Sequence, residues 1–144
     1  MSCAIPNLCL VIACCTFLCQ GCGTGGSNKF DVSGTITFDG KPVPAGRIDF
    51  FPDLAKGNDG LQGFAIIKDG VFDTRKAGQG HTGGAIVIRI EGFDGKSDDP
   101  KFPGTLIFVP HQITRDLPKE PTTQTFDVPA SAATGLVIPT GPKS

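Results

Sequence analysis

The sequence predicts an all-β protein: a Greek-key β-sandwich of seven or eight strands behind an N-terminal signal peptide. Two observations predict the sandwich. From residue 30 onward, short β-favouring runs alternate with turns rich in Gly, Pro and Asp, and no stretch keeps a helical period beyond a turn or two. A third observation predicts the leader, because all 13 Lys and Arg and all 14 Asp and Glu residues lie at or after residue 29.

The leader contains one apolar run, residues 8–18, which is eleven residues long. That length fits the hydrophobic region of a signal peptide and falls short of the roughly 20 residues that span a bilayer. All 6 cysteines lie at or before Cys22, so the folded part has no disulfide framework. We expect residues 1–21 to be removed and Cys22 alone among the cysteines to remain.

Residues 17–22, Phe-Leu-Cys-Gln-Gly-Cys, resemble a bacterial lipobox, in which small residues precede a cysteine that is diacylated and becomes the mature N-terminus. Gly21 fits this pattern, whereas Cys19 stands where Leu, Val or Ile is preferred. The resemblance implies lipidation of Cys22, a lipid anchor in a membrane and a flexible tether over residues 22–29. Ordinary secretion and an uncleaved membrane anchor are the alternatives.

The same resemblance implies a location at the cell envelope, on the periplasmic or extracellular face. Gly23 follows the predicted lipidation site, where an aspartate would resemble a signal for retention in the inner membrane. We therefore expect the outer membrane if the cell has two membranes.

The first predicted strand covers residues 32–38, in which Val32, Ile36 and Phe38 share one face and polar residues occupy the other. Residues 39–46 contain two prolines and are predicted to form a loop or a bent edge. Alternation resumes over residues 47–52, which is expected to bury Ile48 and Phe50. Residues 53–60 are polar and loop-like.

A hairpin is predicted over residues 64–74, because Asp69-Gly70 supplies the two positive φ angles of a type I′ turn. A glycine-rich loop, residues 78–84, then leads to a strand over residues 85–91 with alternate isoleucines facing the core. Three more strands are predicted over residues 105–109, 123–128 and 136–138. The sandwich domain thus spans residues 30–138, and residues 139–144 are expected to fray.

Residues 32–46 resemble the opening of carboxypeptidase-regulatory-like domains, a family of transthyretin-like (prealbumin-like) sandwiches with an Ig-like arrangement. In that family a Val-x-Gly-x-Val strand precedes a Gly-x-Pro-Val turn. The matching positions here are Val32, Gly34, Ile36, Gly40, Pro42 and Val43. The resemblance is closest to small bacterial lipoproteins that carry this domain alone, and it implies a fold without specifying an activity.

Charge and motifs predict a binding or structural module that is not an enzyme. The net charge is −1 with both signs interspersed, which does not favour nucleic-acid binding. No Gly-x-Ser-x-Gly motif of a serine nucleophile occurs. We expect a protein partner at the cell envelope and no cofactor. The alternative is a periplasmic or surface metal-handling protein or enzyme that uses loop histidines and carboxylates.

The candidate metal ligands for this alternative come from two groups. His81 and His111 could bind zinc if the fold brought both to a carboxylate. Asp94, Asp98 and Asp99 offer the oxygen ligands that calcium prefers. The simpler interpretation is a pair of exposed loop histidines and a solvated acidic turn. A phosphate site at residues 78–84 would need a following helix, whereas a strand is predicted there.

Overall fold

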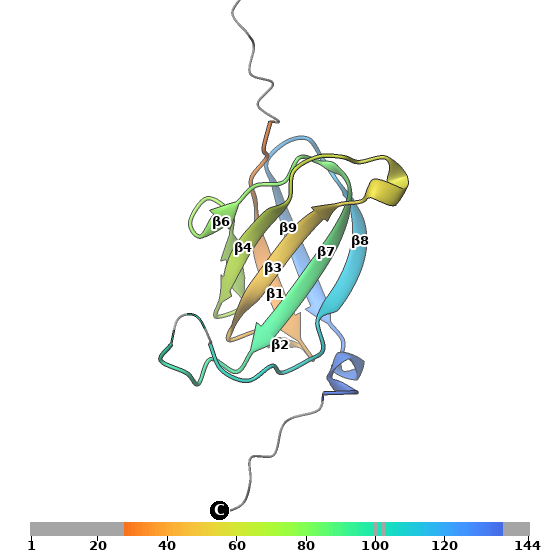
Figure 1. Cartoon of the computed structure of the whole chain (residues 1–144). Helices are drawn as coiled ribbons and strands as arrows, with labels where there is room; N and C mark the ends of the chain where they lie inside the picture. The colour runs from red at the N-terminus through yellow and green to blue at the C-terminus, as the bar shows by residue number, and fades with distance from the viewer. Residues whose placement is uncertain (1–27, 100, 102, 137–144) are drawn as a thin grey trace, which may run out of the picture.

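The structure is a computed structural model that describes residues 28–99, 101 and 103–136. Within these residues the protein is all-β, as predicted, and its nine strands form one curled, mostly antiparallel sheet with the shape of a half-barrel (Figure 1). The helical elements of the described part are two short 3-10 turns, η1 and η2. The elements, in chain order, are β1 (Val32–Phe38), β2 (Lys41–Pro42), β3 (Ala45–Pro52), η1 (Leu54–Lys56), β4 (Gly63–Lys68), β5 (Val71–Asp73), β6 (Gly78–Gln79), β7 (Gly84–Phe93), β8 (His111–Leu117), β9 (Thr122–Val128) and η2 (Ala130–Ala133).

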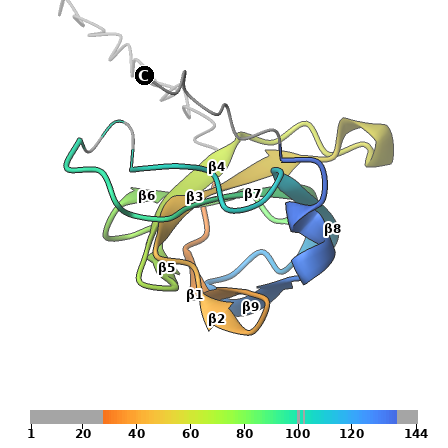
Figure 2. The ribbon, with the colours of Figure 1, turned by 90° about the horizontal axis from the view of Figure 1, so that it is seen from below.

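The strands are ordered β2-β1-β5-β4-β3-β7-β8, with β6 beside β4 and β9 beside β1. Seen along the strands, β3, β4 and β7 form one side of the curl and β1, β2 and β9 the other (Figure 2). The β1–β9 pair is parallel over all seven residues of each strand, although β8 precedes β9 directly in the chain. The last strand therefore returns to the first.

The curl has two ends, which we name by the segments that meet there. At the N-terminal end lie residue 28, the loop of residues 53–62, residues 80–84 and the turn of residues 118–121 (Figure 1). At the opposite end lie the turns at residues 39–40 and 69–70 and the loop of residues 94–110. Strand β7, ten residues long, runs about 30 Å between the two ends.

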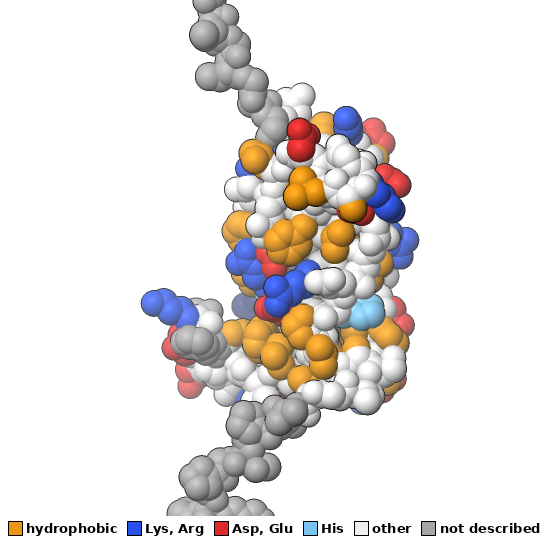
Figure 3. Space-filling view, turned by 45° about the vertical axis from the view of Figure 1, so that its right-hand side comes forward, with side chains coloured by type: hydrophobic (Ala, Val, Ile, Leu, Met, Phe, Trp, Pro, Cys, Tyr) orange, Lys and Arg blue, Asp and Glu red, His pale blue; other side chains and the backbone are white. Residues whose placement is uncertain are grey.

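The outer face of β3 and β7 is charged. Arg47 lies opposite Glu91 and Asp49 lies opposite Arg89, so the two signs alternate across the strand pair. The Arg47 Nε donates to Asp49 Oδ1 at 2.8 Å, and Arg89 pairs with Glu91 along β7. Figure 3 shows charged side chains spread among hydrophobic ones on the visible face. One side of the sheet is thus suited to water.

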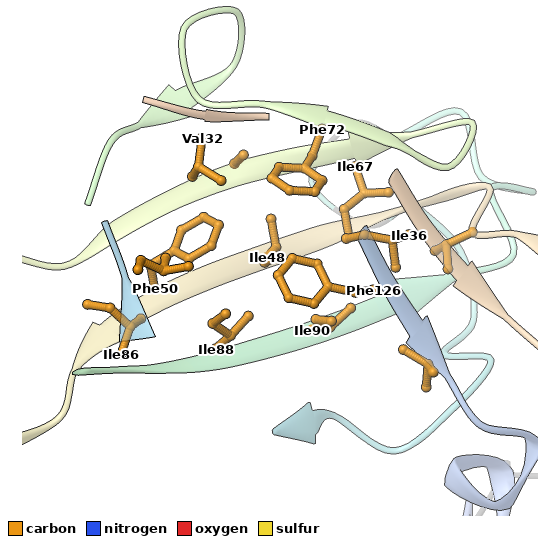
Figure 4. Packing of buried hydrophobic residues seen from close by; sticks show 14 of the residues in the cluster. Val32, Ile36, Ile48, Phe50, Ile67, Phe72, Ile86, Ile88, Ile90 and Phe126 are labelled. Atoms are coloured by element: carbon orange, nitrogen blue, oxygen red, sulfur yellow. The ribbon is translucent and has the colours of Figure 1, made fainter. Parts of the chain in front are cut away.

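The inner face of the curl holds the core. Ile48 and Phe50 of β3 and the three isoleucines of β7 have no exposed surface, as the alternation predicted. Figure 4 shows these side chains packed toward Val32 and Phe126, which come from β1 and β9. The core is therefore made by the two sides of the curl pressing their alternate residues together.

The predicted hairpin is present. Asp69 has a φ angle of 51° and Gly70 a φ angle of 76°, and both are positive, as a type I′ turn requires. The type I′ turn joins β4 to β5. Asp39-Gly40 forms a second turn of the same kind, with φ 48° at Asp39, and it joins β1 to the two-residue strand β2. Residues 39–46 were predicted to form a loop or a bent edge, and in the structure they contain the turn and the short strand β2.

The prediction of a strand over residues 105–109 is wrong. This segment forms a single bridge, from Leu106 to Phe93 at the end of β7, and it crosses the opposite end of the curl. Phe108 is fully buried there, because its ring lies against Gly92 and would clash with a side chain at that position. The apolar pattern thus reflects burial, and the segment pairs with β7 only at this one bridge.

Strand β8 was not predicted, and its residues lie between the strands predicted over residues 105–109 and 123–128. It pairs with β7 alone among the described residues, from Gly84 beside Leu117 to Ile90 beside His111. As an edge strand it carries mostly polar residues, so its alternation is weak. The strand predicted over residues 136–138 lies outside the described residues except for Leu136, which is not in a strand.

Candidate functional site

The predicted site residues fall in three separate places. Cys22 lies outside the described residues. His81 is at the N-terminal end, while His111 begins β8 toward the opposite end. Asp94, Asp98 and Asp99 belong to the loop after β7.

His81 is fully buried, which corrects the prediction of an exposed loop histidine. Its backbone forms a two-way bridge with Phe30: the Phe30 N–H donates to the His81 carbonyl at 2.7 Å, and the His81 N–H donates to the Phe30 carbonyl at 3.0 Å. Gly80 permits this approach, because a Cβ there would lie 2.5 Å from the Phe30 oxygen. The ring of His81 lies 6.0 Å from that of Phe50, so the glycine-rich segment turns its histidine into the core.

The imidazole of His81 is held as a neutral acceptor. Its Nδ1 accepts a hydrogen bond from the Gly83 N–H at 2.9 Å, and in the neutral ring the proton is therefore on Nε2. Nε2 is buried and has no hydrogen-bond partner in the described part of the chain. Burial lowers the pKa of His81 below its usual value, and the nearby charge of Asp31 opposes this only in part. Protonation would also turn Nδ1 into a second donor facing the Gly83 N–H.

Acidification is therefore expected to destabilise the domain through His81. The pKa of this histidine is about 6.5 in the unfolded chain and lower in the folded one, so the unfolded chain takes up the proton first as pH falls. The contribution of His81 to the free energy of unfolding is complete above about pH 6.5 and is lost as pH falls toward the folded pKa. Urea unfolding between pH 7 and pH 5 measures it.

The control for this experiment is His81→Asn, which keeps an oxygen acceptor for the Gly83 N–H and does not titrate. All other side chains are the same in both proteins, so their effects cancel in the comparison. The free energy of unfolding should fall more steeply with acid in the wild type than in His81→Asn. Parallel slopes would show that His81 keeps the same pKa when the chain unfolds.

The structure does not bring the two histidines together. His111 lies beside Ile90, whereas His81 precedes Gly84 at the other end of β7. Ile90 is six positions after Gly84, which is about 20 Å along a strand. The ligands of one zinc ion each lie about 2 Å from the metal, so His81 and His111 cannot share one.

Two of the three aspartates hold backbone groups of the loop after β7. Asp94 Oδ1 accepts from the backbone N–H groups of Lys96, at 3.2 Å, and Thr105, at 3.0 Å, and these two bonds lower the pKa of Asp94. Asp99 Oδ1 accepts from the Lys101 N–H at 2.8 Å, and Asp98 is exposed. Within the described ranges, no group of three or more His, Cys, Asp or Glu side chains is arranged to hold a metal ion.

A polar pocket of about 540 Å³ opens at the N-terminal end, between residue 28, the loop of residues 53–62 and residues 82–85. Asn58 organises it: the side-chain amide donates to the carbonyls of Gly83, at 2.9 Å, and Ala85, at 2.7 Å, and its oxygen accepts from the Gly60 N–H at 3.1 Å. Lys56 and Lys119 are exposed on its rim. We call this hollow the N-terminal pocket. Asn58 was predicted only to lie in a polar loop. Its role in the pocket could not be predicted, because two of its three hydrogen bonds join it to residues 25 and 27 positions away.

A second hollow lies on the outer face of β1, β4 and β5. This outer groove, of about 630 Å³, is lined by Gly34, Ile66 and Val71 and by two lysines, Lys68 and Lys76, among others. Ile66 and Val71 keep 46% and 54% of their surface exposed, so its floor is apolar although it faces water.

The fold and these two hollows define an all-β domain with a polar pocket at one end and an apolar groove on one face. No protein family, curated protein or solved structure matches the chain. Among the described residues, no helix has the length and apolar character that crossing a membrane would require.

Proposed function

We propose that the protein is an exported lipoprotein, anchored to a membrane through acylated Cys22, that displays a non-catalytic binding or structural domain at the cell envelope. The observation that carries this proposal is the leader: 28 residues without a charged side chain, with an apolar run that ends shortly before Gly21-Cys22. The described domain begins only a few residues later, at residue 28. Two or more acyl chains would hold such a protein on a membrane almost permanently.

The domain itself supports a role in binding or structure. Three of the candidate site residues serve the fold: His81 fills the core, and Asp94 and Asp99 accept backbone hydrogen bonds. The outer groove offers an apolar surface of a kind that protein partners use. The proposed location is the periplasmic or extracellular face of the envelope, and the outer membrane where there are two.

We also propose that the curled sheet is a Greek-key sandwich of the transthyretin-like, carboxypeptidase-regulatory-like kind. Two features support this assignment. The segment of residues 32–46 that resembles the family opening forms β1, a turn and the start of β3. The return of β9 to β1 places the two sides of the curl face to face around one core.

Replacing Cys22 by serine is expected to abolish lipidation, because serine has no thiol to carry the first acyl group. Cells that express the protein and are fed an alkyne analogue of palmitate should label the wild type and not Cys22→Ser. The variant should also leave the membrane fraction.

The matched control is Cys19→Ser, which removes a cysteine three residues earlier in the same leader. If Cys22 is the lipidated residue, this control keeps its label. Equal labelling of the wild type and Cys22→Ser would overturn the proposed anchor.

A further inference from the structure

Two large hydrophobic side chains are left exposed at the N-terminal end. Leu54 keeps 76% and Leu61 52% of its surface accessible, and both belong to the loop that joins β3 to β4. The residues between them, 56–60, line the N-terminal pocket together with Asn28. The segment between the two leucines therefore lies at the same end of the domain as Asn28, where the described chain begins.

We propose that this end of the domain lies on the lipid surface, with Leu54 and Leu61 inserted at the boundary between headgroups and acyl chains. The inference depends on the lipid anchor proposed above. Between Cys22 and Asn28 there are six Cα–Cα steps, which reach at most about 20 Å. An anchored domain is therefore kept close enough for this loop to touch the membrane, and exposed leucines favour that interface.

The strands set which side chains can reach the lipid. They run between the two ends of the curl (Figure 1). Strand β4, six residues long, joins the loop of residues 53–62 to the turn at residues 69–70, so this turn is about 20 Å from the N-terminal end. Val71, just after that turn, is exposed to 54%, close to the value for Leu61. The two positions differ mainly in their distance from the proposed membrane contact.

Net charge does not account for this contact. The three segments that meet around the N-terminal pocket, residues 28–31, 53–62 and 118–121, carry lysines and carboxylates in similar number: Lys29, Lys56 and Lys119 against Asp31, Asp53, Asp59 and Glu120. Attraction to anionic lipids needs an excess of cations. The leucines are thus the main attractive groups, and a zwitterionic membrane should be sufficient.

Tryptophan fluorescence tests the proposal cleanly, because the chain has no Trp and no Tyr. The full-length, lipidated variants Leu54→Trp, Leu61→Trp and Val71→Trp are each placed in phosphatidylcholine vesicles whose acyl chains are brominated. We expect the emission of Leu54→Trp and Leu61→Trp to fall at least about twofold relative to unbrominated vesicles, because bromine quenches only at close range and these side chains lie at the interface. Val71→Trp should be unaffected.

Flotation of the same vesicles separates the two proposals. If the protein does not float with the lipid, the anchor proposal fails and this inference fails with it. If all variants float but Leu54→Trp and Leu61→Trp are quenched no more than Val71→Trp, the membrane contact alone is overturned. Quenching that disappears in phosphatidylcholine and returns only with anionic lipid would also contradict the leucine-driven contact.

Discussion

Replacing Gly34 by alanine is expected to destabilise the domain strongly, and much more than the same replacement at Gly40 in the turn after β1. Gly34 lies in the middle of β1, where a Cβ would be 1.7 Å from the backbone oxygen of Gln124 in β9. A backbone atom cannot move aside by changing a rotamer, so the parallel pair must separate. Overpacking of this kind costs about 3 kcal/mol or more, a large part of the roughly 5–15 kcal/mol that stabilises a domain.

The control is Gly40→Ala in the turn after β1. Gly40 has φ 71°, and a Cβ there would meet no atom within 4 Å. This variant carries only the conformational cost of a left-handed residue, about 1–2 kcal/mol. Thermal unfolding followed by circular dichroism should show a much larger fall in Tm for Gly34→Ala. Similar falls in Tm would mean that β9 does not lie against β1 as the structure has it.

Phe50→Ala is expected to have the second large effect. Phe50 has no exposed surface, and its ring lies 6.3 Å from that of Phe72 and 6.0 Å from that of His81. Truncating a buried phenylalanine removes its apolar contacts and leaves a cavity, which costs about 3–5 kcal/mol. The midpoint of urea unfolding should fall accordingly.

The next residue supplies the control. Phe51 is on the opposite face of β3, beside Val87, and is only half-buried. Phe51→Ala removes the same atoms from the same strand and should cost about 1 kcal/mol, since only part of its surface is taken from water. Equal losses of stability from the two variants would contradict the assignment of β3's faces.

Much of the local structure could be predicted from the sequence, because it depends on neighbouring residues. The alternation over residues 85–91 predicts which isoleucines face the core, and Asp69-Gly70 predicts the hairpin turn. The missed strand β8 shows the limit. Its polar pattern reflects its place at an edge of the sheet, which the residues themselves do not specify. Residues 105–109 show the reverse error: their apolar pattern predicted a strand, but it comes from packing across an end of the curl.

The candidate hollows could not be predicted at all. The N-terminal pocket joins segments near residues 28, 58, 83 and 119, which are far apart in the chain. The outer groove depends on Gly34 lying beside β5 and on Ile66 facing outward. Such surfaces exist only after the strands have found their partners.

The sequence by itself determined the all-β class, the alternating faces of the central strands, the Asp-Gly turn and the absence of charged side chains from residues 1–28. These are properties of composition and of short-range spacing. Only the tertiary structure decided that β9 lies parallel to β1, that His81 is buried against Phe50, and that Leu54 and Leu61 share an end with the start of the domain. The physical reason is that pairing, burial and shared surfaces are contacts between residues distant in sequence, and their energies depend on the whole folded sheet.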